Sequence, residues 1–146
     1  MELREQRVWQ GRYRDINFKI INWGRDDAAS QLLDLPTGHW NYYVYIPESK
    51  ATDFKSIWLK DLLKRWSKEG RPYLTHDYMA GTLGNIEMHG GITYYAKHGH
   101  TKGHRCVEIG CDYAHSWDRN AHYDVEALMA DVETTIDDLY NKGIVK

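Results

Sequence analysis

The side chains best suited to do chemistry gather between residues 89 and 118. His89, Asp112, His115 and Asp118 combine imidazoles that titrate near neutral pH with carboxylates that can orient them. Such a set can supply a general base, with His89, Asp112 and His115 as candidate catalytic residues. All four can instead hold Zn²⁺ or another divalent metal, the only cofactor that the pattern suggests, or they can hydrogen-bond a ligand. Histidine and aspartate at strand ends also often satisfy backbone groups, which is the structural alternative.

Two predicted strands, residues 85–97 and 105–113, must bring these groups together. Apolar residues alternate in both strands and must face one core. They are Ile92, Tyr94 and Ala96 in the first strand, and Val107, Ile109 and Cys111 in the second. This pattern predicts that even-numbered residues of the first strand pair with odd-numbered residues of the second. With a turn near Thr101, His89 then lies almost opposite Asp112, and His115 and Asp118 follow where the chain leaves the sheet.

Three glycines lie within the same predicted strands. Gly90, Gly91 and Gly110 weaken a sheet unless a bulge or the close approach of another group requires them. A ligand above a glycine-lined floor would account for all three, and a structural bulge would account for them equally well. The ligand alternative predicts a binding site made of His89, Gly90, Gly91, Thr93, Asp112, His115, Trp117 and Asp118.

The other elements predict a single α+β domain over residues 1–146. Strands are expected at residues 3–9, 12–22 and 39–46, with a hairpin turn or bulge at Gly11. Apolar residues recur at helical spacing in residues 52–68 and 124–141, where Thr52 and Asp124 suit the N-cap position. Residues 71–84 are expected to form a long connection. We therefore predict a mostly antiparallel, twisted sheet with two amphipathic helices packed on one face.

Composition limits the classes of function. The chain has 6 tryptophans and 11 tyrosines against 2 phenylalanines, and rings with a polar tip suit half-buried sheet faces, interfaces and stacking pockets. The formal net charge is -2, so extended nucleic-acid binding is not expected. Cys106 and Cys111 are an odd number of positions apart, so a strand places them on opposite faces as reduced thiols. Because no signal peptide or long apolar run is found, we expect a cytoplasmic protein without membrane contact.

Two segments of the second half carry a resemblance to a known group. Residues 89–94 read HGGITY and residues 110–118 read GCDYAHSWD. They resemble the H-G-G-x-T-(Y/F) and G-x-D-x-A-H-x-x-D motif pair of short, uncharacterised proteins encoded by phages and prophages, in which a C-terminal helix follows. The resemblance implies a small accessory protein acting in the host cytoplasm. Inhibition of a host defence system, by binding its protein or capturing its nucleotide signal, is the role that this setting implies.

These observations support competing hypotheses of function. The first is a phage-type counter-defence inhibitor, a binding protein that holds a host protein or a nucleotide. The alternative is a small hydrolase or nuclease, metal-dependent if His89, Asp112, His115 and Asp118 coordinate a cation. A virion or scaffold component, which would form a stable oligomer, is a third. Because Walker-type, dinucleotide-binding, zinc-protease and nucleophile-elbow motifs are absent, we favour the first. The sequence does not determine the ligand or the oligomeric state.

Overall fold

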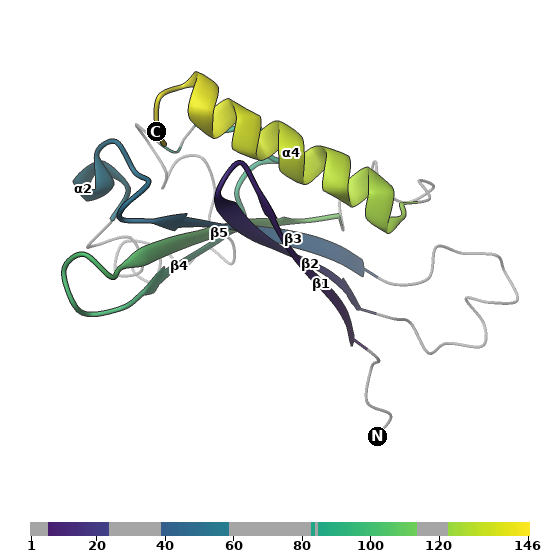
Figure 1. Cartoon of the computed structure of the whole chain (residues 1–146). Coiled ribbons are helices and arrows are strands. Elements are labelled where there is room, and N and C mark those ends of the chain that lie inside the picture. Colours follow the sequence, from purple (N-terminus) through teal and green to yellow (C-terminus); the bar gives the residue numbers. More distant parts are fainter. Residues whose placement is uncertain (1–5, 24–38, 59–82, 84, 114–122) are drawn as a thin grey trace, which may run out of the picture.

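Five antiparallel strands and one long helix across one face make up most of the described part of the protein. A computed structural model describes residues 6–23, 39–58, 83, 85–113 and 123–146. The strands are β1 (Gln6–Tyr13), β2 (Ile16–Trp23), β3 (His39–Pro47), β4 (Tyr94–His98) and β5 (Cys106–Asp112), and the helices are α2 (Phe54–Ile57) and α4 (Val125–Asn141). The sheet order is β1-β2-β3-β5-β4. The predicted α+β class with an antiparallel sheet is therefore confirmed (Figure 1).

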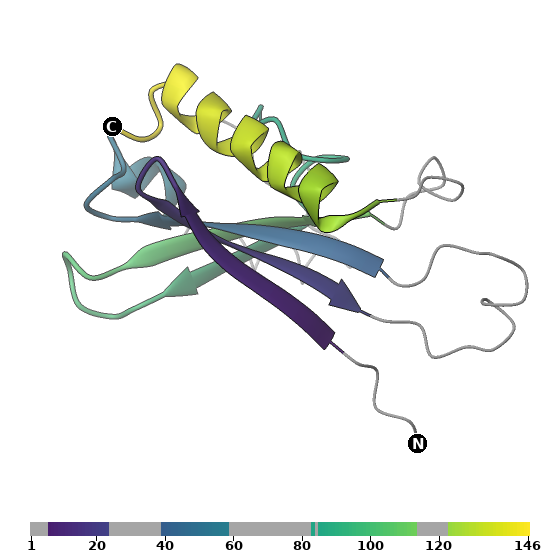
Figure 2. The same ribbon diagram turned by 45° about the vertical axis from the view of Figure 1, so that its right-hand side comes forward.

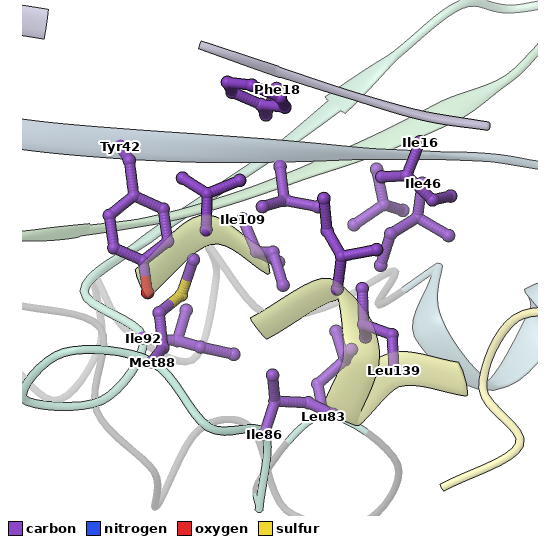
Figure 3. Packing of buried hydrophobic residues seen from close by; sticks show 14 of the residues in the cluster. Ile16, Phe18, Tyr42, Ile46, Leu83, Ile86, Met88, Ile92, Ile109 and Leu139 are labelled. Atoms are coloured by element: carbon purple, nitrogen blue, oxygen red, sulfur yellow. The ribbon is translucent and has the colours of Figure 1, made fainter. Parts of the chain in front are cut away.

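The core lies between the sheet and α4, which stays on the same face of the sheet in both views (Figures 1 and 2). Alternation along each strand turns every second side chain toward the helix. The buried apolar residues of this face include Ile16, Phe18 and Ile20 in β2, Val44 and Ile46 in β3, Val107 and Ile109 in β5, and Leu128, Val132, Ile136 and Leu139 in α4. Figure 3 shows that Leu83, Ile86, Met88 and Ile92, from the segment before β4, join the same core.

The helix α4 forms where its sequence predicts it. The Asp124 carboxylate caps the first turn by accepting a hydrogen bond from the Ala127 N–H at 2.8 Å. At the other end Gly143 has a φ of 70°, a left-handed conformation that favours glycine after a helix. The chain then turns back, and Val145 forms an isolated bridge with Ala51. The C-terminal residues are thereby tied to the segment that follows β3.

The second predicted helix is confirmed only as the four-residue α2. Thr52, the expected N-cap, donates its backbone N–H to the Ile144 carbonyl at 2.9 Å, and the helix begins two residues later without a side-chain cap. Trp58 leaves helical geometry (φ -86°, ψ 82°), and residues 59–68 lie outside the described part. Within the described ranges only α4 has seven or more residues. The prediction of two amphipathic helices on one face is therefore confirmed for one of them.

The N-terminal hairpin turns at a different place from the one predicted. β1 and β2 are joined by Arg14 and Asp15, whose φ angles of 48° and 65° are both left-handed, as a two-residue hairpin of the type I′ class requires. Gly11 lies inside β1, opposite Phe18, and forms neither turn nor bulge. A Cβ atom at this position would meet the Phe18 ring at 2.5 Å. The close approach of this ring explains the glycine.

The strand predicted over residues 85–97 is wrong in its first half. Residues 85–93 form turns and irregular backbone, and of the predicted strand only the part that forms β4 pairs with β5. The register joins Tyr94 to Gly110 and Tyr95 to Ile109, so the predicted pairing of even with odd numbers is wrong as well. Tyr95 is the ring that enters the core, at 6% exposure, while Tyr94 is 41% exposed. The prediction took Ile92 as a sign that even-numbered residues of this strand face the core. Because Ile92 precedes β4, its burial does not show which residues of the strand face the core.

Two further predictions concern the connection before residue 85 and contact with a membrane. The connection predicted at residues 71–84 lies outside them except for Leu83, which is 2% exposed and packs in the core. Of the helices described, none has both the length and the apolar composition needed to cross a bilayer.

Candidate functional site

The residues of the predicted site do not converge in the described part of the chain. The His89 ring stacks on Tyr113, with ring centroids 3.8 Å apart and an interplanar angle of 11°. The Asp112 carboxylate instead accepts a hydrogen bond from the Thr93 hydroxyl at 3.3 Å. Because neighbouring residues of a strand point to opposite faces, Asp112 lies on the face away from α4 while Tyr113 and His89 lie on the helix side. Of the predicted residues, Thr93 and Asp112 meet, whereas His89 does not join them.

Three of the predicted site residues cannot be placed in this arrangement. His115, Trp117 and Asp118 lie outside the described residues. Within the residues that the structure describes, no three histidine, cysteine, aspartate or glutamate side chains form a group that could hold a metal ion. The four-residue metal set predicted from the sequence therefore gains no support from its two described members, His89 and Asp112.

The three glycines have local structural reasons. Gly90 and Gly91 have φ angles of 70° and 87°, and the Gly91 N–H donates to the Met88 carbonyl at 2.8 Å, which closes a turn. At Gly110, a Cβ atom would collide with the Tyr43 ring. A tyrosine ring thus occupies the space above this glycine where the sequence suggested a ligand.

A first group of polar and aromatic side chains lies on the helix side of the sheet. We call Tyr42, His89, Tyr113, Tyr123 and Asp131 the helix-side cluster. The Tyr113 and Tyr123 rings meet edge to face at 4.7 Å, and the Tyr113 hydroxyl donates to the Asp131 carboxylate of α4. Burial raises the pKa of the Tyr113 hydroxyl, and its hydrogen bond to Asp131 raises the pKa further, so this phenol stays protonated.

Hydrogen bonds of the helix-side cluster run in one direction. The His89 N–H donates to the Tyr42 hydroxyl at 3.4 Å, and the Thr135 hydroxyl donates to the Glu87 carbonyl at 2.6 Å. Because the single hydroxyl proton of Thr135 is used there, Tyr42 must be the donor in the 2.8 Å bond between their oxygens. The hydroxyls of Tyr42 and Thr135 therefore each donate one hydrogen bond and accept another.

The helix-side cluster leaves little room for a ligand. The hollow beside it has a volume of about 150 Å³ and is lined by Tyr42, Glu87, Met88, His89, Asp131 and Thr134. Sites for small molecules usually have about 300–1,000 Å³. Among the described residues, its rings contact one another and Tyr113 donates to Asp131 of α4, so the cluster helps to hold the segment before β4 and the helix α4 onto the sheet.

A second group lies on the opposite face, which no helix of the described part covers. We call Lys19, Tyr43, Tyr45, Tyr94, His98 and Glu108 the far-face cluster. The strand register explains why they meet: Lys19 is the partner of Tyr43, Tyr43 of Gly110, and Gly110 of Tyr94, in one row across four strands. In the next row Tyr45 is the partner of Glu108. The cluster therefore draws on β2, β3, β4 and β5.

Glu108 is the centre of the far-face cluster. Its side chain is 5% exposed, and its two carboxylate oxygens lie 2.7 Å from His98 Nε2 and 3.9 Å from Lys19 Nζ. Burial raises the pKa of the Tyr45 hydroxyl, as does its hydrogen bond with Glu108, so Tyr45 remains a donor to the carboxylate. A buried charge persists when partners of this kind surround it. Lys19 and His98, 27% and 51% exposed, connect the carboxylate with solvent.

The rings of the far-face cluster are only partly covered. Tyr43 and Tyr94 meet edge to face with centroids 5.1 Å apart, and Lys19 Nζ lies 5.0 Å from the Tyr43 ring centroid. Burial, followed by the neighbouring Tyr94, raises the pKa of Tyr43 to about 12. These phenols are neutral at physiological pH, so the cluster carries charge only on Lys19, Glu108 and, when protonated, His98.

Sequence reasoning missed the far-face cluster, although one signal for it was present. Residues 40–46 alternate between Tyr42, Val44 and Ile46 on one side and Tyr43 and Tyr45 on the other. Both sets are apolar or aromatic, so the alternation of hydropathy that normally marks two faces is weak. The partners that complete the cluster come from β4 and β5, and their register was predicted wrongly.

Comparison of the chain with protein-family models, with curated proteins and with solved structures produced no match.

Proposed function

We propose that the protein is a binding protein that holds a nucleotide on the far-face cluster. One observation carries the proposal: three tyrosine rings, a lysine and a histidine surround a buried carboxylate on a sheet face that α4 does not cover. Flat rings on an exposed sheet are a common platform for stacking nucleobases. The 41% exposure of Tyr94 makes part of this platform accessible from solvent.

The charges of the cluster fit a small ligand better than a long strand of nucleic acid. Affinity for extended nucleic acid comes chiefly from many lysine or arginine contacts with phosphates. The chain has a formal net charge of -2, and Glu108 lies within 3.9 Å of Lys19 Nζ. Because Glu108 is only 5% exposed and already bound by Lys19 and His98, the partly exposed aromatic rings are the groups left for a ligand, and they suit a single base.

The resemblance to short phage and prophage proteins supports a biological setting for this binding. In that setting the protein acts in the host cytoplasm as a counter-defence inhibitor, by sequestering a nucleotide signal. A host protein as partner, the other form of this hypothesis, has less support, because the exposed large apolar side chains of the described residues, Val8, Tyr94 and Met129, belong to three separate elements. The hydrolase alternative stays a hypothesis: His115 and Asp118 lie outside the described residues, and the two described members of its set, His89 and Asp112, lie on opposite faces.

The test is calorimetric titration of the full chain with AMP, GMP, CMP and UMP and with the four corresponding nucleosides. We expect at least one of the four monophosphates and its nucleoside to bind. Replacing Tyr94 by Leu, which keeps an apolar side chain but removes the ring, should weaken this binding about tenfold, because stacking contributes about 1–3 kcal/mol per base. Tyr94→Phe is the matched control and should bind nearly as the wild type does. Absence of binding by all eight compounds at millimolar concentration would overturn the proposal.

A further inference from the structure

A hollow adjoins the far-face cluster at the end of the sheet nearest the β1–β2 turn. Its volume is about 490 Å³, which lies within the usual range for small-molecule sites. Arg12, Asn17, Tyr45 and Ser49 are among the residues that line it. It is therefore more than three times as large as the hollow beside the helix-side cluster, and unlike that hollow it is lined by a guanidinium group.

The strand register connects this hollow with the aromatic rings. Arg12 is the partner of Asn17, and Asn17 is the partner of Tyr45, so the three lie in one row across β1, β2 and β3. Neighbouring strands are about 4.8 Å apart, which places the Arg12 backbone about 10 Å from that of Tyr45. An arginine side chain can span much of that distance. Tyr45 belongs both to the wall of the hollow and to the far-face cluster, so a single ligand can contact both.

The charges of the hollow favour an anion. Arg12 and Lys50 contribute two positive charges and Asp15 one negative charge. The ion pair between Arg12 Nη2 and Asp15 Oδ1 is long, at 3.6 Å, and the two side chains are 64% and 72% exposed. Such a pair holds its members weakly, so the Arg12 fork is available to a ligand. Lys50 Nζ lies 5.2 Å from the Tyr140 ring centroid, which makes Arg12 the principal cation facing the hollow.

The other polar groups of the hollow do not oppose an anion. Asn17 and Ser49 offer an amide and a hydroxyl as hydrogen-bond donors. Cys106 also lines the hollow, and burial, followed by the nearby Glu108, raises the pKa of its thiol to about 11. The thiol is therefore uncharged at neutral pH. Guanidinium, amide and hydroxyl donors around one space are the set that binds a phosphate group.

We propose that the Arg12 hollow binds the phosphate of a nucleotide whose base stacks on the Tyr94 ring and lies beside Tyr43. This inference rests on the proposed function and makes it more specific, since it selects phosphorylated nucleosides over free nucleosides. A bidentate contact with Arg12 would fix the phosphate, and Tyr45 would lie beside the sugar that joins the two ends of the ligand.

The experiment compares three probes by calorimetric titration of the full chain: the tightest nucleoside monophosphate of the panel, its free nucleoside and inorganic phosphate. The wild type is compared with Arg12→Ala and with Lys102→Ala, which removes the same charge from the exposed β4–β5 loop. We expect Arg12→Ala to weaken binding of the monophosphate about tenfold and to leave the nucleoside unaffected. Lys102→Ala should change neither. Raising the salt concentration should weaken the monophosphate more in the wild type than in Arg12→Ala.

The outcomes separate this inference from the proposed function. Equal affinity for the nucleoside and its monophosphate, with no effect of Arg12→Ala, would overturn the phosphate site and leave base binding intact. Equal losses in Arg12→Ala and Lys102→Ala would also overturn it, because they would show a general effect of net charge. Binding of inorganic phosphate that depends on Arg12, without any binding of nucleosides or nucleotides, would support an anion site and overturn the nucleotide ligand. Arg12→Lys, which keeps the charge but loses the fork, should restore only part of the affinity.

Discussion

The helix-side and far-face clusters lie on the two faces of one sheet and use the same kinds of residue. Each combines tyrosine rings, a histidine and a carboxylate. On the helix side, Tyr113 is 6% exposed, donates to Asp131 and has its ring stacked on His89. On the far face, Tyr94 is 41% exposed and has its ring edge against Tyr43. The same chemistry therefore contributes to packing on one face and remains accessible on the other.

The difference shows why the identity of residues alone does not separate a packing cluster from an accessible one. A histidine beside a carboxylate suggests catalysis or binding only where a ligand can reach it. His89 belongs to the more enclosed of the two clusters, whereas His98, which no sequence argument singled out as a site residue, lies 2.7 Å from the buried Glu108 and is half exposed. Accessibility, set by which face the long helix covers, separates the two.

The largest expected effect comes from removing one ring on each face. Tyr113→Ala should lower the free energy of unfolding by about 3–5 kcal/mol, because it empties a buried ring site. Tyr94→Ala should cost about 1 kcal/mol or less, since this ring is 41% exposed and its ring contact within the described residues is the one with Tyr43. Urea denaturation followed by circular dichroism measures both. Similar losses in the two variants would remove the distinction between a packing cluster and an accessible one.

A smaller effect is expected when the hydroxyl chain of the helix-side cluster is interrupted. Tyr42→Phe keeps the ring but leaves the buried Thr135 oxygen without its donor, at a cost of about 1–3 kcal/mol. Tyr43→Phe is the matched control on the far face and should change the free energy of unfolding little, because solvent reaches that ring. The same denaturation experiment decides this. A neutral Tyr42→Phe substitution would show that the chain of hydrogen bonds does not stabilise the fold.

The smallest effect on stability at neutral pH, and the clearest dependence on pH, is expected at the two cysteines. Cys111 is 1% exposed on the helix side, and Cys106 is half-buried on the far face with a thiol pKa of about 11 in place of 9.0. Alkylation by iodoacetamide, mapped by mass spectrometry, should modify Cys106 first, and faster as pH rises toward 11. Because folding raises the pKa of Cys106, the contribution of its protonated thiol to the free energy of unfolding is complete below pH 9. This contribution is lost as the pH rises through 11. Modification of Cys111 before Cys106 would contradict the assignment of faces.

Long periodic patterns allowed much of the fold to be predicted. The α4 stripe with its Asp124 cap, and the strand that became β3, lie close to their predicted bounds. The hairpin at Arg14 and Asp15 was not predicted, because neither residue is a glycine or asparagine that would mark a left-handed turn. The turn or bulge was predicted at Gly11 instead. A glycine is required there because the Phe18 ring of the neighbouring strand leaves no room for a side chain.

The candidate site could be predicted less well, because it depends on the relative phase of two strands. Both Tyr94 and Tyr95 are aromatic, so the sequence offers no contrast to say which one enters the core. A shift of one residue exchanges the two faces of a strand. Taking Tyr94 as buried put His89 opposite Asp112 and obscured the grouping of Tyr94 with Tyr43 and Lys19. Burial of Tyr95 against the core, which depends on the whole fold, settles the phase.

The pairing of β3 with β5 has a consequence for how the chain folds. Val44 pairs with Ile109, 65 positions further along the sequence, whereas β1, β2 and β3 pair in chain order, as do β4 and β5. Contacts between distant segments form slowly, so joining these two halves is expected to limit the folding rate. The far-face cluster takes Lys19, Tyr43 and Tyr45 from one half and Tyr94, His98 and Glu108 from the other. A ligand that contacts both halves would slow the separation of β3 from β5. The lifetime of the folded state would therefore increase with the fraction of protein that has bound the ligand.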